Sequence, residues 1–178
     1  MVKNSSEKYG VAAKILHWTC AAMVVGLFGL GIWMVELSYY DDWYVTAPHY
    51  HNSLGILLAL LMIIRLAWRI TNLQPAPEKS LSHLEKVAAH RAHWLLYGLI
   101  FIMIVTGYLI PTADNRSIDV FNWFSVPALG SLFVHQEDIA GDIHKWCAYG
   151  LMLLAVIHAT AALKHHLVNR DNTLRRML

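Results

Sequence analysis

The sequence predicts an all-α membrane protein, an up-and-down four-helix transmembrane bundle with both termini in the cytoplasm. Its composition is the first reason, because 57% of the 178 residues are hydrophobic and only 15% are charged, which is too apolar for an ordinary soluble domain. The second reason is the presence of four apolar segments, each close to the roughly 20 residues that a helix needs to cross a bilayer. The third is an uneven distribution of basic residues along the chain.

The four predicted spans cover residues 15–37, 51–70, 92–111 and 143–164. The first apolar run is too long for the hydrophobic region of a signal peptide, so we interpret it as a span. Residues 38–50, 71–91 and 112–142 are rich in Pro, Asp, Asn and Ser, and we expect them to form the connecting loops. No internal repeat is evident, and we expect a single domain over residues 1–178.

The basic residues predict the orientation of the bundle. Twelve of the fourteen Lys and Arg residues belong to the N-terminal segment, the second connection and the C-terminal segment, whereas only Arg116 and Lys145 belong to the other side. Eight of the twelve acidic residues lie on that other side. Basic residues concentrate in the cytoplasm, so both termini should be cytoplasmic. We expect membrane lipid as a partner and no nucleic acid.

Four of the eleven histidines lie within or at the end of an apolar span: His17, His51, His144 and His158. Ionisable groups at such positions in a membrane are usually functional. His144 and His158 are about 21 Å apart along one helix and about 40° short of four full turns, so they share nearly the same face. The fourth span therefore presents two imidazoles at two depths.

The other two histidines have the matching depths. His17 and His158 should lie about 4.5 and 9 Å inside the cytoplasmic edge, from the helical rise past Lys14 and before Lys164. His51 and His144 each begin a span that enters from the opposite side. The predicted pairs are therefore His17 with His158 and His51 with His144.

Two imidazoles that face each other at matched depth suit the axial positions of a six-coordinate haem iron. Two such pairs predict two haems, an inner one at His17 and His158 and an outer one at His51 and His144. Glycines and alanines near these positions leave space for a macrocycle. Two alternatives remain: hydrogen-bonded histidines between helices, and a zinc or copper site, which would usually gather its ligands in one place.

With these residues in view, the sequence resembles the prokaryotic cytochrome b561 family. The resembling segments are "KILHWTCA", "HNSLGILLALLMIIRLAWR", "AAHRAHWLLYGLIF", "HKWCAYGLMLLAVIHATAALKHH" and "RDNTLRRML". The family consists of four-helix membrane proteins that carry two haems b and exchange electrons with quinone. The resemblance implies the same four axial ligands, two haem b cofactors and a place in the bacterial inner membrane.

The resemblance also implies a quinone site on the cytoplasmic side, with ubiquinone as the expected quinone. Superoxide oxidases of the family use a histidine seven residues past the fourth ligand, which matches His165, and a lysine in the second connection. Here Ser80 occupies the expected place of that lysine, and Lys79 is displaced from it by one position. A quinone headgroup needs hydrogen-bond donors and a proton route, which suits imidazoles at the membrane edge; His90, His93 and His166 are also available there. The alternative for these histidines is contact with lipid headgroups.

Arg65 and Arg69 lie at the inner end of the second span and are candidates for contacts with haem propionates. Simple anchoring of the span by positive charge is the alternative.

The expected function is electron transfer between the quinone pool and a periplasmic donor or acceptor. One reading is an oxidoreductase of the superoxide:quinone type, although a basic funnel would be expected to attract the superoxide anion and the outer connections are acidic. Another reading is a conducting subunit that docks a periplasmic redox protein through aromatic and acidic loops such as "YYDDWY" and "FNWF". A membrane scaffold without haem is a third.

Overall fold

Four long helices make up most of the chain in the computed structural model, which describes residues 1–78 and 80–178. The helices are α1 (Val11–Val35), α2 (Thr46–Thr71), α3 (His83–Thr112) and α4 (Gln136–Lys164). A short hairpin of β1 (Ile118–Val120) and β2 (Phe124–Val126) precedes α4, and a π-helical turn, η1 (His165–Asn169), follows it. All four helices are long and apolar enough to cross a membrane, so the prediction of a four-span bundle is confirmed.

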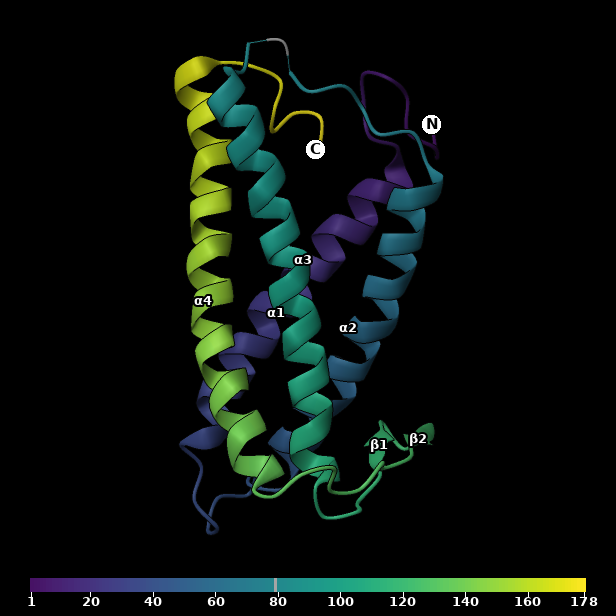
Figure 1. Ribbon diagram of the computed structural model, residues 1–178, viewed down its shortest axis with the longest axis vertical. Coiled ribbons are helices and arrows are strands. Elements are labelled where there is room, and N and C mark those ends of the chain that lie inside the picture. The colour runs from purple at the N-terminus through teal and green to yellow at the C-terminus, as the bar shows by residue number, and fades with distance from the viewer. Residues whose placement is uncertain (79) are drawn as a thin grey trace.

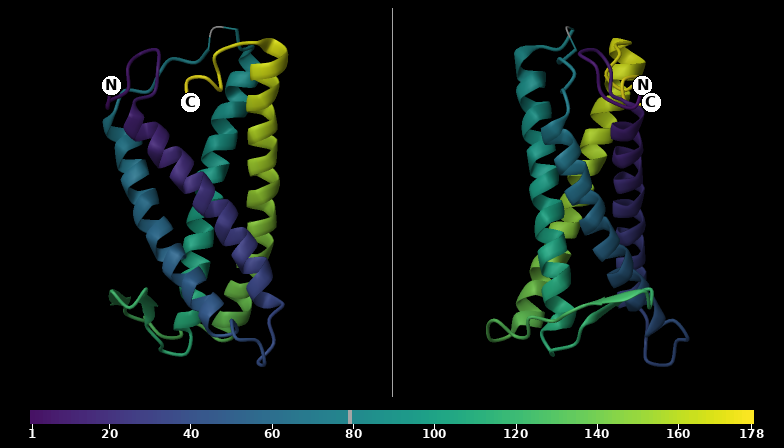
Figure 2. Two further views of the ribbon diagram at one scale, coloured as in Figure 1. Left: turned by 180° about the vertical axis from the view of Figure 1, so that it is seen from behind. Right: turned by 90° about the vertical axis from the view of Figure 1, so that its right-hand side faces the viewer.

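The helices run up and down, with both termini at the same end (Figure 1). α3 and α4 lie side by side, whereas α1 crosses obliquely, from beside the end of α2 to the beginning of α4 (Figure 2). We call the end that holds both termini the terminus end and the opposite end, with β1 and β2, the hairpin end. This arrangement lets α4 contribute residues to both ends of the bundle interior.

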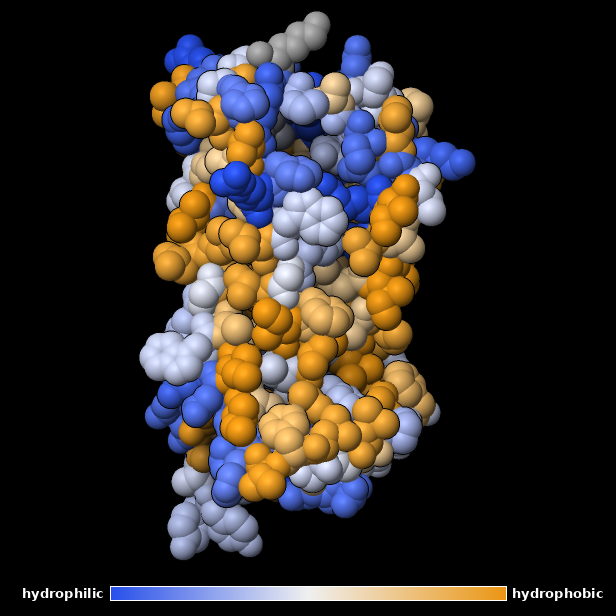
Figure 3. All heavy atoms as spheres, in the orientation of Figure 1, coloured by the Kyte–Doolittle hydropathy of each residue, from blue (hydrophilic) through white to orange (hydrophobic). Residues whose placement is uncertain are grey.

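On the face seen in Figure 3, apolar side chains cover most of the middle, and polar residues are more frequent toward the two ends. The buried core is small and consists of Cys20, Leu58, Met62, Ile100 and Leu151. Large apolar side chains elsewhere on the helices point outward and are exposed. Outward-facing apolar residues around a modest core are expected where the solvent is lipid.

All four helices begin earlier than the predicted spans, and the interpretation of residues 46–50, 83–91 and 136–142 as loop was wrong. Polar residues there serve as helix starts. Ser82 and Glu85 form a capping box, in which each side chain bonds to the backbone N–H of the other. Pro48 lies in the first turn of α2, where a missing N–H costs nothing.

The third connection contains the β-hairpin, which sequence analysis did not predict. β1 and β2 pair antiparallel, with Asp119 opposite Ser125, and Phe121 and Asn122 turn between them with positive φ angles of 46° and 59°. Ser53 of α2 fixes the hairpin, because its Oγ accepts from the N–H of Phe121 (3.1 Å) and donates to the carbonyl of Asp119 (3.2 Å). The hairpin is therefore held over the first turns of α2.

The C-terminal tail, residues 170–178, folds back across the terminus end. Arg176 donates to the carbonyl oxygen of Ala76 (2.6 Å) and lies 3.1 Å from the carboxylate of Glu78. The indole N–H of Trp18 donates to the carbonyl oxygen of Met177 (2.8 Å). The tail thus ties the beginning of α1 to the segment that follows α2.

Candidate functional site

The hairpin end holds the first histidine pair. His51 of α2 and His144 of α4 lie in the bundle interior with their ring centres 6.2 Å apart and their planes at 70°. Both rings are half-buried. The Nδ1 atom of His51 is buried and has no hydrogen-bond partner among the described residues. These are the two residues expected to meet from their equal depths.

Thr106 of α3 determines which nitrogen of His144 carries hydrogen. Its Oγ1 lies 2.7 Å from the carbonyl oxygen of Ile102, to which it donates its only hydrogen, and 3.0 Å from Nδ1 of His144. The hydroxyl must therefore accept from His144, so the neutral ring carries its proton on Nδ1. The lone pair on Nε2 is left available to a metal ion, and an oriented second nitrogen is usual in metal-binding histidines.

Two glycines make room for the rings of this pair. A Cβ atom at Gly107 of α3 would lie 3.0 Å from Cε1 of His144, and one at Gly31 of α1 would lie 3.2 Å from Cε1 of His51. Both distances are shorter than ordinary carbon contacts of about 3.5–4.0 Å. Any other residue at either position would push an imidazole out of its present place.

The terminus end holds the second pair and a third histidine. His17 of α1 and His158 of α4 have ring centres 6.4 Å apart with planes at 67°. His93 of α3 lies closer still to His158, at 5.3 Å between ring centres. Sequence analysis placed His93 only among the histidines at the membrane edge. His93 lies one residue inside the predicted third span, and this position was the one indication in the sequence that its side chain belongs to the bundle.

Arg65 of α2 points into this second cluster. Its guanidinium donates to Nδ1 of His17 at 2.8 Å and lies over the ring of Tyr97, 5.4 Å from the ring centre. Arg69 also lies over the Tyr97 ring, 5.8 Å from its centre. Both arginines therefore lie over Tyr97, and Arg65 contacts a histidine of this cluster.

The separation within each pair fits a shared metal ion. An imidazole nitrogen binds a metal ion at about 2.0 Å, so two rings that hold one ion between them must have centres more than twice that distance apart. The observed separations are 6.2 and 6.4 Å. Ordinary edge-to-face ring pairs span about 4.5–7 Å, so the same distances also suit a direct contact between two rings. A measurement of the metal content of the protein distinguishes a shared metal ion from such a contact.

His165 and its neighbours form a polar cluster at the terminus end. The ring is only 8% exposed, and its Nδ1 lies 2.8 Å from Asp171 Oδ2. Its Nε2 lies 3.8 Å from Glu85 Oε1. Ser80 Oγ reaches the same Asp171 oxygen at 3.5 Å. Ser80 therefore belongs to the His165 cluster through Asp171, whereas Lys79 lies outside the described residues.

Asp171 and Glu85 were not expected from the sequence to be functional residues. Asp171 lies in the C-terminal tail, six residues after His165 in an irregular segment, so no helical period connects the two. Glu85 belongs to a helix turn that was interpreted as loop. The only available signal was that both carboxylates lie on the terminus side, where just four of the twelve acidic residues occur.

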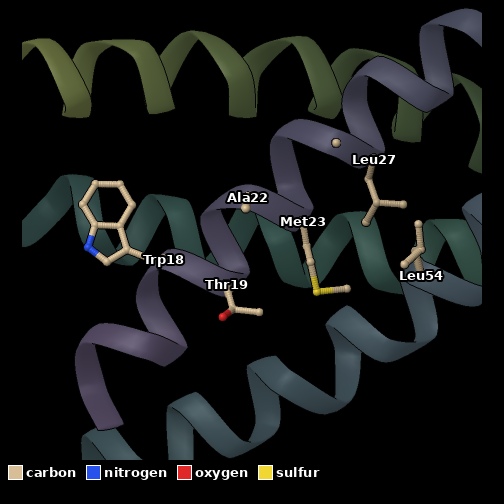
Figure 4. A pocket seen from close by; sticks show the side chains of 7 residues that line it. Trp18, Thr19, Ala22, Met23, Leu27 and Leu54 are labelled. Carbon is tan, nitrogen blue, oxygen red and sulfur yellow. The ribbon is translucent and has the colours of Figure 1, made fainter. Parts of the chain in front are cut away.

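An apolar groove of about 580 Å³ runs along α1. Figure 4 shows Met23 and Leu27 of α1 on the side of that helix that faces Leu54 of α2. The lining is completed by Trp18, Thr19, Ala22 and Gly26. The groove is separate from the polar cluster around His165, and its lining includes none of the paired histidines.

Comparison with known proteins relates this arrangement to a family. The family model for prokaryotic cytochrome b561 matches residues 8–178. The chain is 47% identical to cytochrome b561 homolog 2 of Escherichia coli over 98% of this chain and 93% of that protein. It is 31% identical to a probable superoxide oxidase of Yersinia pestis, with 97% and 96% covered. It is 29% identical to cytochrome b562 of Cereibacter sphaeroides, with 92% and 90% covered. The chain therefore belongs to the prokaryotic cytochrome b561 family, and it is a multi-pass membrane cytochrome of the b type.

Proposed function

We propose that this protein carries two haems b and transfers electrons between a quinone and a donor or acceptor on the other side of the bacterial inner membrane. His17 and His158 would hold the iron of one haem, and His51 and His144 that of the other. The observation that carries the proposal is the presence of two histidine pairs, at opposite ends of the bundle, with separations of 6.4 and 6.2 Å. Haem b, when bound, supplies reversible one-electron chemistry.

The residues around each pair have distinct tasks. At the hairpin end, Thr106 orients His144 and directs its Nε2 lone pair toward a ligand role. At the terminus end, Nδ1 of His17 accepts from Arg65, so the neutral ring carries its proton on Nε2. His17 would hold the iron through Nε2 with its own proton on Nδ1, an arrangement in which Nδ1 no longer accepts from Arg65. The guanidinium would then be free to pair with a haem propionate.

We place the quinone at the terminus end, on the cytoplasmic side, with ubiquinone as the expected substrate. The excess of Lys and Arg at this end supports the orientation. His165 offers a nearly buried imidazole at the membrane edge, as a quinone oxygen requires. Ser80 contributes through Asp171, and Lys79 is a further candidate from the sequence. Residues 1–178 would act as one functional unit.

Superoxide is one candidate for the outer reductant, because a relative named a probable superoxide oxidase is 31% identical to this chain. The charges at the hairpin end disfavour capture of an anion. Arg116 lies 2.6 Å from the carboxylate of Asp114 and is paired with it. Lys145, next to His144 in the sequence, lies over the ring of Trp146. The local attraction for an anion would therefore depend mainly on Lys145.

A second candidate function is that of a conducting subunit that docks a periplasmic redox protein. The hairpin end favours it, because it carries aromatic side chains that are largely open to solvent, including Tyr40 with 92% exposure. Acidic residues accompany them in the same connections. Such a surface suits a partner with a basic patch.

Haem content tests the central proposal. Single alanine variants at His51 or His144 should lose the hairpin-end haem, and variants at His17 or His158 should lose the other. Each should retain about half of the haem found in the wild type, measured as pyridine haemochrome per chain. Four variants that all retain two haems would refute the ligand assignment. Rapid haem reduction by superoxide would favour the oxidase over the docking subunit.

A further inference from the structure

His165 is flanked by carboxylates on both ring nitrogens. Asp171 Oδ2 lies 2.8 Å from Nδ1, and Glu85 Oε1 lies 3.8 Å from Nε2. These groups come from three different elements, since Glu85 belongs to α3, His165 to η1 and Asp171 to the C-terminal tail. The one cation that faces the cluster is Lys164 among the described residues, with Nζ 3.4 Å from the same Glu85 oxygen.

The two carboxylates differ in their access to water. Asp171 is 9% exposed, whereas the Glu85 side chain is 35% exposed. Burial by itself would raise the pKa of Asp171, but hydrogen bonds from Thr173 and His165 outweigh it and hold that pKa below its usual value. The pKa of Glu85 is lowered as well, by hydrogen bonds from Ser82 and by the pairing with Lys164, so both carboxylates are anions at neutral pH. Glu85 is the one of the two that water reaches.

The backbone places Asp171 against His165 for a definite reason. The helix widens into η1 after Lys164, and Arg170 then reverses the chain with a φ angle of 52°. The N–H of Asp171 donates to the carbonyl oxygen of His165 at 3.2 Å. Widened helical turns of this kind occur frequently at functional sites. The turn returns the Asp171 carboxylate to the ring six residues before it.

We propose that Asp171, His165 and Glu85 form a proton-delivery unit for the bound quinone. Asp171 is a positioning residue that holds the ring through Nδ1–H, and Glu85 relays protons to Nε2 from the aqueous side. The inference rests on the proposed function, which supplies the quinone and the electrons. His165 is the member of the unit that would touch the quinone.

The proton transfer to the quinone matches the number of electrons that the proposed function supplies. A quinone that becomes a hydroquinone gains two electrons, delivered one at a time from the outer reductant through the haems, and two protons. For each proton, the Nε2–H bond of His165 breaks and an O–H bond forms on a quinone oxygen. The Glu85 carboxylate then takes up a proton from the aqueous side and passes it to Nε2, which restores both Nε2–H and the carboxylate.

The test is the oxidation of reduced haem by a soluble ubiquinone analogue in the haem-loaded protein, followed by stopped-flow absorbance across a pH series. Removal of a nearby negative charge lowers the pKa of an imidazole, by an amount that is often one unit or more. In Asp171→Asn, the pH at which the rate declines should therefore move down by about one unit, and the rate at pH 7.5 should fall about tenfold. Glu85→Gln should slow the same reaction, with an increased solvent deuterium isotope effect.

Three further variants distinguish the positioning of His165 by Asp171 from a general loss of order in the C-terminal tail. Lys164→Gln removes a cation and should move the decline to higher pH, opposite to Asp171→Asn. Asp171→Glu should restore part of the rate. Glu78→Gln is the structural control, because it weakens the tail at Arg176 without contacting His165, and its pH profile should follow the wild type. The ¹⁵N signals of labelled histidine, with His165 assigned by its loss in His165→Gln, report the protonated fraction without turnover.

The outcomes distinguish this inference from the function on which it rests. Wild-type haem that ubiquinone cannot oxidise would refute the proposed quinone reaction itself. A wild type that reacts, with Asp171→Asn and Glu85→Gln superimposed on it at full haem content, would refute only the proton-delivery unit. A loss in Glu78→Gln equal to that in Asp171→Asn would also refute it, because tail stability would then explain both.

Discussion

Thr106 Oγ1 lies 3.0 Å from His144 Nδ1, and the same hydroxyl donates to the carbonyl oxygen of Ile102 one turn earlier in α3. The threonine is thus an acceptor toward the ring, fixed by its own helix. Acceptance of a hydrogen bond from Nδ1–H makes an imidazole a more basic ligand. In the proposed cytochrome, Thr106 would stabilise the oxidised iron of the hairpin-end haem.

Thr106→Val should raise the reduction potential of the hairpin-end haem. The variant keeps the shape of the side chain and removes the acceptor, so His144 becomes a weaker electron donor. A net hydrogen-bond contribution of about 0.5–1.5 kcal/mol corresponds to a shift of about 20–60 mV for a one-electron couple. A spectroelectrochemical titration that resolves the two haems measures it.

Thr160→Val is the matched control. Thr160 also donates to backbone carbonyl oxygens of its own helix, at 2.8 Å from Val156, but it is exposed and has no histidine neighbour in its hydrogen bonds. Both haem potentials should stay within the error of the wild-type values in this variant. An equal shift in the two variants would show that Thr106 acts through the helix and not through His144.

Substitution of Gly107 by alanine should remove the hairpin-end haem selectively. A Cβ atom there would lie 3.0 Å from the His144 ring, whereas one at Gly31 would lie 3.2 Å from the His51 ring and one at Gly98 would meet nothing within 4 Å. Haem content should therefore fall most in Gly107→Ala, to about half, less in Gly31→Ala, and not at all in Gly98→Ala. Pyridine haemochrome assays give the order, and full content in Gly107→Ala would contradict the crowding argument.

The sequence was sufficient to predict the four helices and the two histidine pairs, although not that His93 joins one of them. Span length, the distribution of charge and the 14-residue spacing of His144 and His158 depend only on helical geometry and membrane thickness. The structure brings His17 near His158 and His51 near His144, as expected from depth. The assignment of the four residues as haem ligands stays a prediction.

The remaining features depend on contacts that periodicity does not encode. The start of α3 was missed because Ser82 and Glu85 are common in loops as well as in capping boxes. The roles of Thr106 and Gly107 require knowledge of which face of α3 packs on α4. Asp171 reaches His165 only because the chain reverses at Arg170.

Acid should release the C-terminal tail only below the usual pKa range of carboxyl groups. The pKa of Asp171 is lowered in the folded protein, where the hydrogen bonds from Thr173 and His165 outweigh the opposing effect of burial. Its stabilisation is therefore complete above the unfolded value of about 3.9 and is lost as pH falls through the lower folded value. Asp171→Asn should show faster amide exchange in residues 170–178 at pH 7, and this difference from the wild type should vanish in strong acid.

Asp42→Asn is the control for tail exchange, because Asp42 lies in an exposed connection at the hairpin end. Its exchange in residues 170–178 should match the wild type at every pH, once corrected for intrinsic rates. Release of the wild-type tail between pH 5 and 6 would contradict a lowered pKa at Asp171.

Salt should accelerate the reduction of the haems by superoxide, if superoxide is the outer reductant. Eight of the twelve acidic residues belong to the hairpin-end side, and their field repels an anion over distances that shrink from about 30 Å at 0.01 M salt to about 8 Å at 0.15 M. The second-order rate constant should rise about twofold or more across that range. A basic redox protein as the reductant should show the reverse, because attraction weakens with salt.

Asp142 tests the same field locally, since it is exposed and lies two residues before His144. Asp142→Asn should increase the rate with superoxide at 0.01 M salt and have little effect at 0.15 M, because screening removes most of the repulsion that the carboxylate exerts. Glu7→Gln makes the same change of charge at the terminus end and should alter neither rate. With a basic redox protein as the reductant, a rate that falls with added salt, and that is lower in Asp142→Asn than in the wild type at 0.01 M salt, would mean that the acidic connections attract the reductant. The docking of a cationic protein would then explain the hairpin end better than the capture of superoxide.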